Sequence, residues 1–433
     1  MRKVHTVGII AEYNPFHCGH AYQLAAVRER FPEARRIAAM SGSIVQRGTP
    51  AICDKWTRAE MAVRSGADLV LELPFVFACR SAQDFARGGV SLLAQAGCDA
   101  LAFGAECQDL GLLQAIAQRI DTPAFQAQLH ETIAAGASYP AALTGILQRD
   151  YGADRAVLTA PNNILALEYL RALAHHPEIR PVLIPREGQA HGETALPDPS
   201  RAGRASASAI RHALFSAEDA GNEPDWNALR AFLPAGGCDR LRQTFAGGLP
   251  RLDRLFRTLK LQLTLRSDEA LRGIYGLSAG DGLLGRLRKA ATKATAMEDF
   301  VHCAASRPYP ASRIRRQILY LLLGVTSHRV QAMDAAGPRY ARVLAFRQTG
   351  RALLQEIVAR GSLPVLTKTS QFLTTKKRQQ DVLTLSEQML ALDTEATELR
   401  ALTMPSMDAQ PNDFNTSPRV VSSAPELSQT ENF

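Results

Sequence analysis

The chain has 433 residues, of which 46% are hydrophobic and 21% are charged, which is the balance of a globular protein with a sizeable core. A chain of this length suggests two or three domains. No apolar run reaches the roughly 18 residues that a membrane helix requires, and the N-terminal stretch soon meets Glu12 and His17, unlike a signal peptide. We therefore expect a cytoplasmic protein without membrane association.

The seven cysteines are scattered along the chain and include no C-x-x-C pair. Such an odd and dispersed set argues against a disulfide framework and against a zinc site. We expect reduced thiols that are buried as small hydrophobic side chains, and no protein-bound metal.

The net charge of +8 is concentrated in one segment of the chain. Between residues 251 and 330, fifteen Lys and Arg stand against six Asp and Glu, so the rest of the chain is close to neutral. Phosphate neutralisation dominates nucleic-acid affinity, so a cationic segment of this kind suggests a nucleic-acid partner. A solvated basic surface explains the charge equally well, and charge alone leaves both interpretations open.

Strand-like and helix-like segments alternate through the first half of the chain. β-Branched apolar runs predict strands, and apolar residues at helical spacing predict helices. The predicted strands are 3–11, 36–40, 68–73, 100–103 and 180–184, and the predicted helices are 20–30, 56–65, 81–96 and 163–174. This alternation predicts an α/β fold with a Rossmann-like, doubly wound parallel sheet.

The strand pattern fades from about residue 222 onward, and the apolar spacing becomes helical. We expect an α/β domain over residues 1–220 and a mainly helical, basic region over residues 221–403. Residues 404–433 are rich in Pro, Ser, Asn and Thr with few large apolar side chains. Such a segment cannot offset its ordering entropy, so we expect a disordered tail there.

The segment 8–20, G-I-I-A-E-Y-N-P-F-H-C-G-H, lies where the first predicted strand turns into the first predicted helix. Parallel sheets bind ligands at the carboxyl ends of their strands, and a helix N-terminus attracts phosphate. His17 and His20 can both face a phosphate bound at this helix N-terminus and donate hydrogen bonds to it. Gly19 lets a ligand approach the backbone closely. A pair of core or metal-binding histidines is the alternative. The preceding strand and the Asn-Pro-Phe sequence favour the nucleotide site.

A second candidate anion-binding motif is R-A-S-A-S-A-I-R, from Arg204 to Arg211. Ser206 or Ser208 would cap a helix, and Arg211 would reach the β- and γ-phosphates of a nucleotide. A Ser-capped helix with a solvated Arg is common, so this motif is weak by itself. It gains significance from its pairing with the histidine motif.

Six phrases of the sequence stand out together: VGIIAEYNPFHCGH, SGSIVQRGTPAICDKWTRAEMAVRSGADLVLELP, FGAE, PNNILALEYL, SASAIRHAL and LAFRQTGRALL. They closely resemble the tRNA(Met) cytidine acetate ligase family, whose fold is similar to that of HIGH-type nucleotidyltransferases. The resemblance implies that ATP and acetate form an enzyme-bound acetyl-adenylate. The acetyl group then passes to N4 of the wobble cytidine of elongator tRNA(Met). ATP with Mg²⁺ is the implied cosubstrate, tRNA and acetate are the implied partners, and no stable protein partner is implied.

The two motifs and the resemblance together assign the site residues. His17, His20 and Lys55 are the catalytic candidates. The basic segment supplies Arg288, Lys289, Arg315 and Arg316 as candidates for tRNA binding. The candidate ATP-binding residues are Val7, Gly8, Ile9, Ile10, Ala11, Glu12, Tyr13, Asn14, Pro15, Phe16, His17, Cys18, Gly19, His20, Gly104, Asn162, Asn163, Arg186, Ser206 and Arg211.

A polar cluster formed by Gln46, Arg47, Asp54, Lys55 and Arg58 lies between the second predicted strand and the second predicted helix. It would hold acetate, Mg²⁺ or the incoming cytidine near the α-phosphate, with Lys55 or Arg47 neutralising charge. In the alternative interpretation, Asp54 simply caps the helix that begins at Lys55.

The sequence departs from the family pattern in a few places. Cys18 stands where Asn is usual, Ser43 and Ile44 replace a common Asn-Phe pair, and the stretch after Arg186 lacks the usual Gly-rich sequence. Two rival functions are a small-molecule nucleotidyltransferase, which leaves the basic half unexplained, and a non-catalytic RNA-binding adaptor, which leaves the paired histidines unexplained.

Overall fold

The computed structural model of the chain describes residues 3–137, 139–151, 158, 160–185, 194–197, 205–278, 280, 282–380, 382–408 and 410–422. The strands are β1 (Thr6–Ala11), β2 (Arg35–Ser41), β3 (Leu69–Leu73), β4 (Ala100–Ala105), β5 (Arg180–Pro185), β6 (Ala341–Arg347), β7 (Val365–Leu366) and β8 (Arg419–Val421). The helices are α1 (Cys18–Arg30), α2 (Lys55–Arg64), α3 (Phe75–Ala78), α4 (Ala82–Gln95), α5 (Leu110–Ile120), α6 (Pro123–Ala134), α7 (Tyr139–Tyr151), α9 (Pro161–Leu173), α10 (Ala207–Asp219), α11 (Trp226–Arg230), α12 (Gly237–Ala246), η1 (Leu252–Leu255), α13 (Phe256–Leu265), α14 (Asp268–Arg272), α15 (Leu283–Lys293), α16 (Met297–Ala304), α17 (Ala311–Leu322), α18 (Ser327–Ala336), α19 (Gln348–Arg360), η2 (Thr369–Gln371), α20 (Thr375–Arg378) and α21 (Leu385–Leu402).

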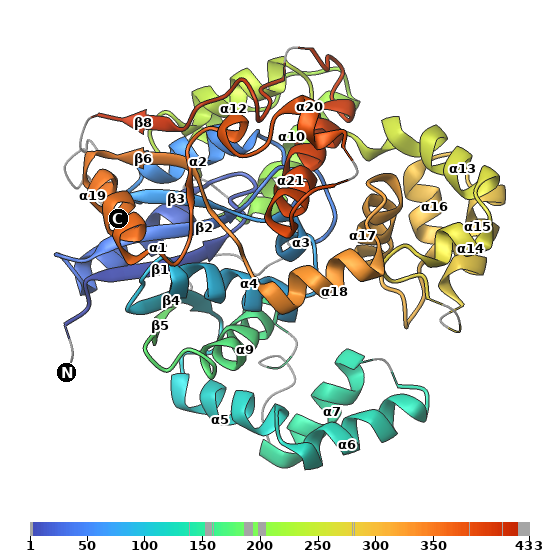
Figure 1. Cartoon of the computed structure of the whole chain (residues 1–433), viewed down its shortest axis with the longest axis horizontal. Helices are drawn as coiled ribbons and strands as arrows, with labels where there is room; N and C mark the ends of the chain where they lie inside the picture. Colours follow the sequence, from blue (N-terminus) through green and yellow to red (C-terminus); the bar gives the residue numbers. More distant parts are fainter. Residues whose placement is uncertain are drawn as a thin grey trace.

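A single sheet organises the described part of the chain (Figure 1). Its strand order is β5-β4-β1-β2-β3-β6-β7, with β8 beside β6. The first five strands are parallel to their neighbours, whereas β6 runs antiparallel to β3. The α/β prediction with its parallel sheet is therefore confirmed. Because β1 lies between β2 and β4, the strand order reverses at β1, and open α/β sheets bind ligands at such a point.

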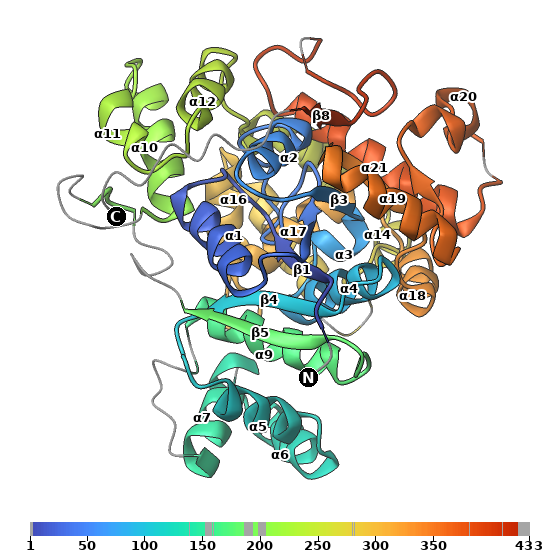
Figure 2. The same cartoon turned by 90° about the vertical axis from the view of Figure 1, so that its left-hand side faces the viewer.

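Helices cover both faces of the sheet, which explains why the central strands are apolar on both sides. In β2, Ala38 and Met40 belong to one core with α1 and α2. Ile37 and Ala39 belong to the opposite core, which includes residues of α4 and α9. This alternation is the two-residue period of a strand, and Figure 2 shows α1 and α4 on opposite sides of β1.

The mainly helical character of the C-terminal half is confirmed, with helices α11 to α21, but the same half also contributes the strands β6 to β8. Figure 1 shows α13 to α16 grouped at one end of the molecule, with α17 between them and the sheet. The chain then returns, and β6 enters the sheet beside β3. A boundary at residue 220 therefore does not separate two independent halves. The sequence did not reveal β6, because its buried run, Ala341 to Ala345, is short, is interrupted by Arg342 and lies between two helical patterns.

The expected tail also differs from the structure over residues 404–422. β8 pairs with Ala345–Arg347 of β6, and Asp413 is buried. The composition of this segment predicted disorder, whereas strand pairing with β6 and a buried carboxylate with two cationic partners hold it against the rest of the chain. Residues 423–433 lie outside the described part of the chain.

Those cationic partners belong to a buried cluster of four charged side chains, Lys55, Glu72, Arg342 and Asp413. The Lys55 ammonium lies 2.8 Å from a Glu72 oxygen and 2.6 Å from an Asp413 oxygen. Arg342 pairs with the same two carboxylates, and all four side chains are at most 5% exposed. Two cations and two anions compensate one another, as buried charges must. The cluster joins α2, β3, β6 and the C-terminal segment.

Two further expectations concern membranes and disulfides. Within the described ranges, no helix is long and apolar enough to cross a membrane. None of the seven cysteines, all of which the structure describes, forms a disulfide. Four of them are buried: Cys79 and Cys98 in the core that includes α4 and α9, and Cys53 and Cys238 in a cluster with residues of α10 to α12.

Replacing Asp413 with Ala should destabilise the protein, because it leaves two buried cations with only Glu72 between them. We expect the free energy of unfolding to fall by about 3 to 5 kcal/mol, measured by urea denaturation. Asp408→Ala is the matched control, since Asp408 is exposed in the same segment. Equal stability of the two variants would contradict the structural role of the cluster.

Candidate functional site

The main pocket of the described chain opens at the carboxyl ends of β1 and β4, where the strand order reverses. It has a volume of about 430 Å³ and is lined from β1, α1, α4, α9, α10 and the loop that follows β2. This size falls in the range of cofactor and small-molecule sites. Of the predicted ATP-binding residues, those that line it are Ile10, Ala11, Glu12, Tyr13, Asn14, His17, Gly19, His20, Gly104, Asn162, Ser206 and Arg211.

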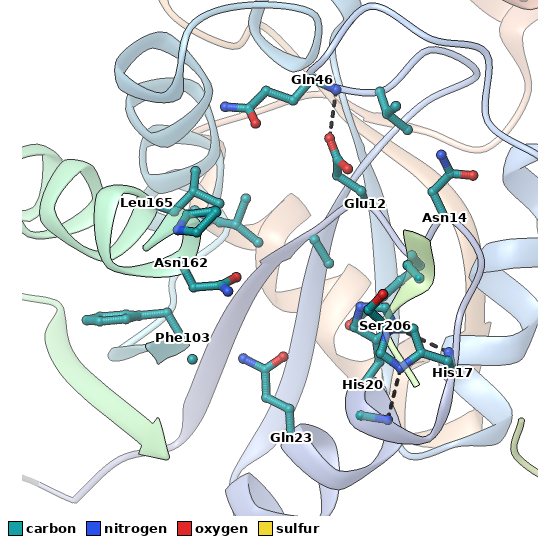
Figure 3. Close-up of a pocket in the computed structure, with 18 of the residues that line it drawn as sticks. Glu12, Asn14, His17, His20, Gln23, Gln46, Phe103, Asn162, Leu165 and Ser206 are labelled. Carbon is teal, nitrogen blue, oxygen red and sulfur yellow. Dashed lines mark hydrogen bonds between the residues drawn. The ribbon is translucent and has the colours of Figure 1, made fainter. Parts of the chain in front are cut away.

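His17 and His20 lie side by side at the N-terminus of α1 (Figure 3), with ring centroids 3.8 Å apart. Nδ1 of His17 accepts a hydrogen bond from the Gly19 N–H at 3.0 Å, and Nδ1 of His20 accepts one from the His17 N–H at 3.2 Å. The two rings thus form a reciprocal capping box for the helix. A ring nitrogen that accepts an N–H presents its lone pair, so the proton of each neutral imidazole lies on Nε2. Both histidines are therefore set as hydrogen-bond donors.

Ser206 and Arg211 form the wall next to the histidines. Ser206 caps α10, because its hydroxyl accepts the Ala209 N–H at 3.0 Å. Arg211 donates to the Asn14 carbonyl at 2.5 Å and to the Ser208 hydroxyl at 3.1 Å, which ties α10 to the turn after β1. Burial lowers the pKa of Arg211 below its ordinary value, and the nearby Glu12 carboxylate partly opposes this shift. Two helix N-termini and a guanidinium thus converge, as an anion site requires.

The opposite end of the pocket is built from Phe103 and Gly104 of β4 and from the start of α9. Asn162 lines the pocket and donates to the Glu106 carboxylate at 2.5 Å. Asn163 has a different role, because it is fully buried and its side-chain oxygen accepts the N–H groups of Glu106 and Cys107 at 2.9 Å each. Asn163 therefore holds the loop after β4 in place.

Several predicted ATP-binding residues do not line the pocket. Val7 and Ile9 point into the core, and a Cβ on Gly8 would lie 2.7 Å from Leu93 of α4, so Gly8 serves close packing of strand and helix. The backbone of Cys18 donates to the Phe232 carbonyl at 2.9 Å. Pro15 and Phe16 are buried beneath the turn. Arg186 lies outside the described residues.

Lys55 also lies elsewhere. It is fully buried in the charge cluster with Glu72 and Asp413 and is absent from the pocket lining, so the expectation of a catalytic Lys55 is wrong for this geometry. Asp54 caps α2 through the Thr57 N–H, which is the alternative that the sequence left open. Arg58 is buried and binds the carbonyls of Glu12, Ser41 and Gly42.

Gln46 and Arg47, by contrast, do line the pocket. The Gln46 N–H donates to the Glu12 carboxylate at 2.7 Å, as Figure 3 shows. Sequence analysis missed Gln23, Phe103 and Leu165, which also line the pocket. Gln23 follows His20 by three residues and therefore lies on the same helix face. Phe103 directly precedes Gly104 in the phrase FGAE. The spacing from His20 and from Gly104 could have identified both residues in the sequence.

The four candidate tRNA-binding residues have different surroundings. Lys289 on α15 is exposed. Arg288 donates to the Leu263 and Arg266 carbonyls at 2.5 and 2.8 Å and pairs with Asp268 at 2.8 Å. It therefore holds α15 to its neighbours, and its assignment to tRNA is not supported.

Arg315 and Arg316 lie on α17, close to the pocket. Arg315 pairs with Glu298 at 2.7 Å, and Arg316 donates to the Gln46 carbonyl at 3.5 Å. Gly48 has φ +75°, and a Cβ there would lie 2.5 Å from the Arg316 backbone nitrogen. The loop that lines the pocket therefore packs directly on the basic helix α17.

The parallel sheet with a pair of capping histidines after its first strand is typical of one class of nucleotide-binding proteins, the HIGH-type nucleotidyltransferases. The profile described as HIGH Nucleotidyl Transferase matches residues 4–415, so the protein is a member of this class. The tRNA(Met) cytidine acetate ligase of Syntrophotalea carbinolica is 37% identical over 430 residues, which cover 96% of this chain and 99% of that protein. The ligase of Syntrophomonas wolfei is 35% identical over 424 residues, covering 95% of this chain and 98% of its own.

Solved structures agree. The apo crystal structure of Thermotoga maritima TmcAL has a TM-score of 0.84 at 31% identity and covers 97% of this chain and 100% of its own. The crystal structure of the same protein bound with alpha-thio ATP has a TM-score of 0.82, with the same identity and coverage. The chain belongs to the tRNA(Met) cytidine acetate ligase family.

Replacing the two neighbouring asparagines one at a time should affect stability differently, because Asn163 is buried and Asn162 lines the pocket. Asn163→Ala leaves two backbone N–H groups unpaired near a buried position, and we expect the free energy of unfolding to fall by about 1 to 3 kcal/mol. Asn162→Ala, which removes a bond on the pocket surface, should change it by less than about 0.5 kcal/mol. Urea denaturation of both variants checks this, and the reverse order of stability would contradict the assignment.

Proposed function

We propose that this protein activates acetate with ATP as acetyl-adenylate and transfers the acetyl group to N4 of the wobble cytidine of elongator tRNA(Met). The observation that carries the proposal is the pair of donor histidines at the start of α1, in a chain that aligns with tRNA(Met) cytidine acetate ligases over nearly their full length. ATP is the first substrate, in agreement with the alpha-thio ATP complex of the Thermotoga relative. ATP and tRNA are both cytoplasmic, which fits the expected location.

In the first step an acetate oxygen attacks the α-phosphate, and pyrophosphate leaves. This step needs positioning and stabilisation of charge rather than proton transfer. The Nε2–H groups of His17 and His20 donate to the phosphate oxygens on which charge builds up. The positive ends of the α1 and α10 helix dipoles also favour the phosphates, and Arg211 neutralises the β- and γ-phosphates.

The adenosine fits at the opposite end of the pocket. Phe103 and Leu165 offer apolar surface for the base, and the bare backbone of Gly104 allows close approach. Asn162 offers both a donor and an acceptor to an adenine edge or a ribose. Gln23 lies between the two ends of the pocket (Figure 3), where it can contact the ribose.

We expect ATP to enter with Mg²⁺. Within the described ranges, no group of three or more His, Cys, Asp or Glu is placed to hold a metal ion. Mg²⁺ keeps several waters and binds through substrate phosphates with one or two carboxylates. The ion therefore requires no protein cage beyond the pocket.

The second step requires the cytidine amine beside the acetyl-adenylate. An anticodon loop already presents its wobble base unstacked. The helical region carries the excess of positive charge, and α17 packs on the loop that lines the pocket. A tRNA bound to this region therefore approaches the pocket from the side of Gln46.

The test of the proposed function is acetate-dependent exchange of pyrophosphate into ATP, followed by mass spectrometry of nucleosides from tRNA(Met) treated with the protein. Exchange that depends on acetate, together with N4-acetylcytidine at the wobble position, supports the proposal. Exchange that depends on a phosphate ester instead would identify a small-molecule nucleotidyltransferase. The absence of any exchange would leave only an RNA-binding role.

Replacing His20 should remove most of the adenylate formation. We expect His20→Ala to lower the rate of acetate-dependent exchange roughly a hundred- to a thousandfold, the usual cost of losing one transition-state donor. His20→Gln should lose less exchange than His20→Ala, because Gln still accepts the His17 N–H and keeps an amide N–H donor. His130→Ala, on the exposed surface of α6, is the control. Exchange within tenfold of the unmodified protein in a folded His20→Ala variant would contradict this role.

Two lysines on α15 test the tRNA surface. Lys289 and Lys293 are exposed and four residues apart, so they share one helix face. Their joint replacement by Ala should make the plot of log affinity against log salt less steep by about one to two units. Acetate-dependent exchange should persist, because neither residue lines the pocket. Lys3→Ala combined with Lys368→Ala removes the same charge from exposed positions near the sheet and serves as control. An equal change in both double variants would place the tRNA elsewhere.

A further inference from the structure

The pocket contains few groups that can accept a proton. Among its described lining residues, Glu12 is the single carboxylate. It stands directly after β1 and is partly buried. The remaining candidates are the two histidines and the tyrosines of the wall.

The histidines and tyrosines are unsuited to this role. Nδ1 of His17 and Nδ1 of His20 each accept a backbone N–H. Each neutral ring therefore offers only its Nε2–H, which is a donor and cannot accept a proton. Tyrosine phenols are protonated at neutral pH, and burial raises the pKa of Tyr13 and Tyr169 further above the ordinary value. Glu12 is thus the group that can take up a proton in this pocket.

Glu12 is held in a defined position. One carboxylate oxygen accepts the Gln46 N–H at 2.7 Å, and the Glu12 carbonyl accepts from Arg58 at 2.6 Å. Figure 3 shows Glu12 and Gln46 on one side of the pocket, with Gln23 on the opposite side. Fixed rotamers and supporting hydrogen bonds are what a catalytic group needs.

The position of Glu12 also relates it to the basic helices. Gln46 donates its N–H to Glu12 and accepts from Arg316 of α17 through its carbonyl. A single residue therefore separates the Glu12 carboxylate from the helical region. Any base that is delivered from that region meets the wall of the pocket that carries Glu12.

We propose that Glu12 is the general base of the acetyl transfer, which accepts the proton from N4 of the cytidine. This inference rests on the proposed function. The exocyclic amine of cytosine is a weak nucleophile because its lone pair is delocalised into the ring. Its attack on the acyl carbon places positive charge on N4, and a positioned carboxylate removes the proton that this charge makes acidic.

The N4 lone pair forms the N4–C bond to the acetyl carbon, and the carbonyl electrons move to oxygen. One N4 proton passes to a Glu12 oxygen. The carbonyl then re-forms, the bond between the acyl carbon and the phosphate oxygen breaks, and AMP leaves with that electron pair. Water afterwards takes the proton from Glu12.

The experiment compares Glu12→Gln and Glu12→Asp in two separate assays. Gln keeps the size of the side chain and an oxygen that accepts the Gln46 N–H, but it cannot accept the proton. The first assay is acetate-dependent pyrophosphate exchange without tRNA. The second is single-turnover transfer from synthetic acetyl-adenylate to tRNA(Met), followed by mass spectrometry of N4-acetylcytidine. Glu29→Gln, an exposed change of the same charge on α1, is the control.

We expect Glu12→Gln to slow the transfer step roughly a hundred- to ten-thousandfold. Because Glu12 also lines the ATP pocket, the deciding quantity is the ratio of the two effects, and we expect transfer to fall at least about tenfold more than exchange. Glu12→Asp should recover part of the transfer rate, because it restores a carboxylate. Transfer by Glu12→Gln close to that of the Glu29→Gln control would overturn the proposal. Loss of exchange to the same extent as transfer would also overturn it and would make Glu12 a magnesium or phosphate-site residue. Failure of the unmodified protein to acetylate tRNA would instead reject the proposed function itself.

Discussion

Four buried charges, on Lys55, Glu72, Arg342 and Asp413, hold the structure of this protein together. Burying each charge alone would cost several kcal/mol, and only mutual pairing offsets that cost. The pairing therefore requires α2, β3, β6 and the C-terminal segment to meet at one place. The constraint extends to the pocket, because a Cβ on Gly42 would lie 2.2 Å from a Glu72 oxygen. The loop that begins at Gly42 carries Gln46 and so forms one wall of the site.

The start of α1 shows how one requirement of folding also prepares the chemistry. A helix N-terminus leaves backbone N–H groups without partners, and here the rings of His17 and His20 satisfy two such groups. Accepting those bonds fixes the proton of each neutral ring on Nε2. The histidines thus stabilise the helix and act as donors through the same arrangement. Because their lone pairs are used in this way, proton uptake falls to a different residue.

The contact between α17 and the loop after β2 changes the relation between the two parts of the chain. The basic helices and the pocket were expected to occupy separate halves, but Arg316 touches the Gln46 carbonyl and Gly48 packs on the backbone of α17. The glycine is required there, since its φ of +75° and the close approach both disfavour a side chain. The helices proposed to bind RNA and the pocket therefore share one structural element.

The sequence by itself determined the parallel strands, the helix that begins near His17, the place of the pocket at the end of β1, and the pairing of the histidines with Ser206 and Arg211. These features depend on local periodicity and on residues close in the chain or in a distinctive motif. Only the tertiary structure decided that β6 and β8 complete the sheet, that Lys55 is a buried ion-pair partner, and that Asn163 supports a loop while Asn162 faces the pocket. Each of these depends on partners dozens to hundreds of residues away, such as Asp413 for Lys55. Tertiary packing decides whether a polar side chain pairs in the core or faces the pocket, and the local sequence pattern does not contain this information.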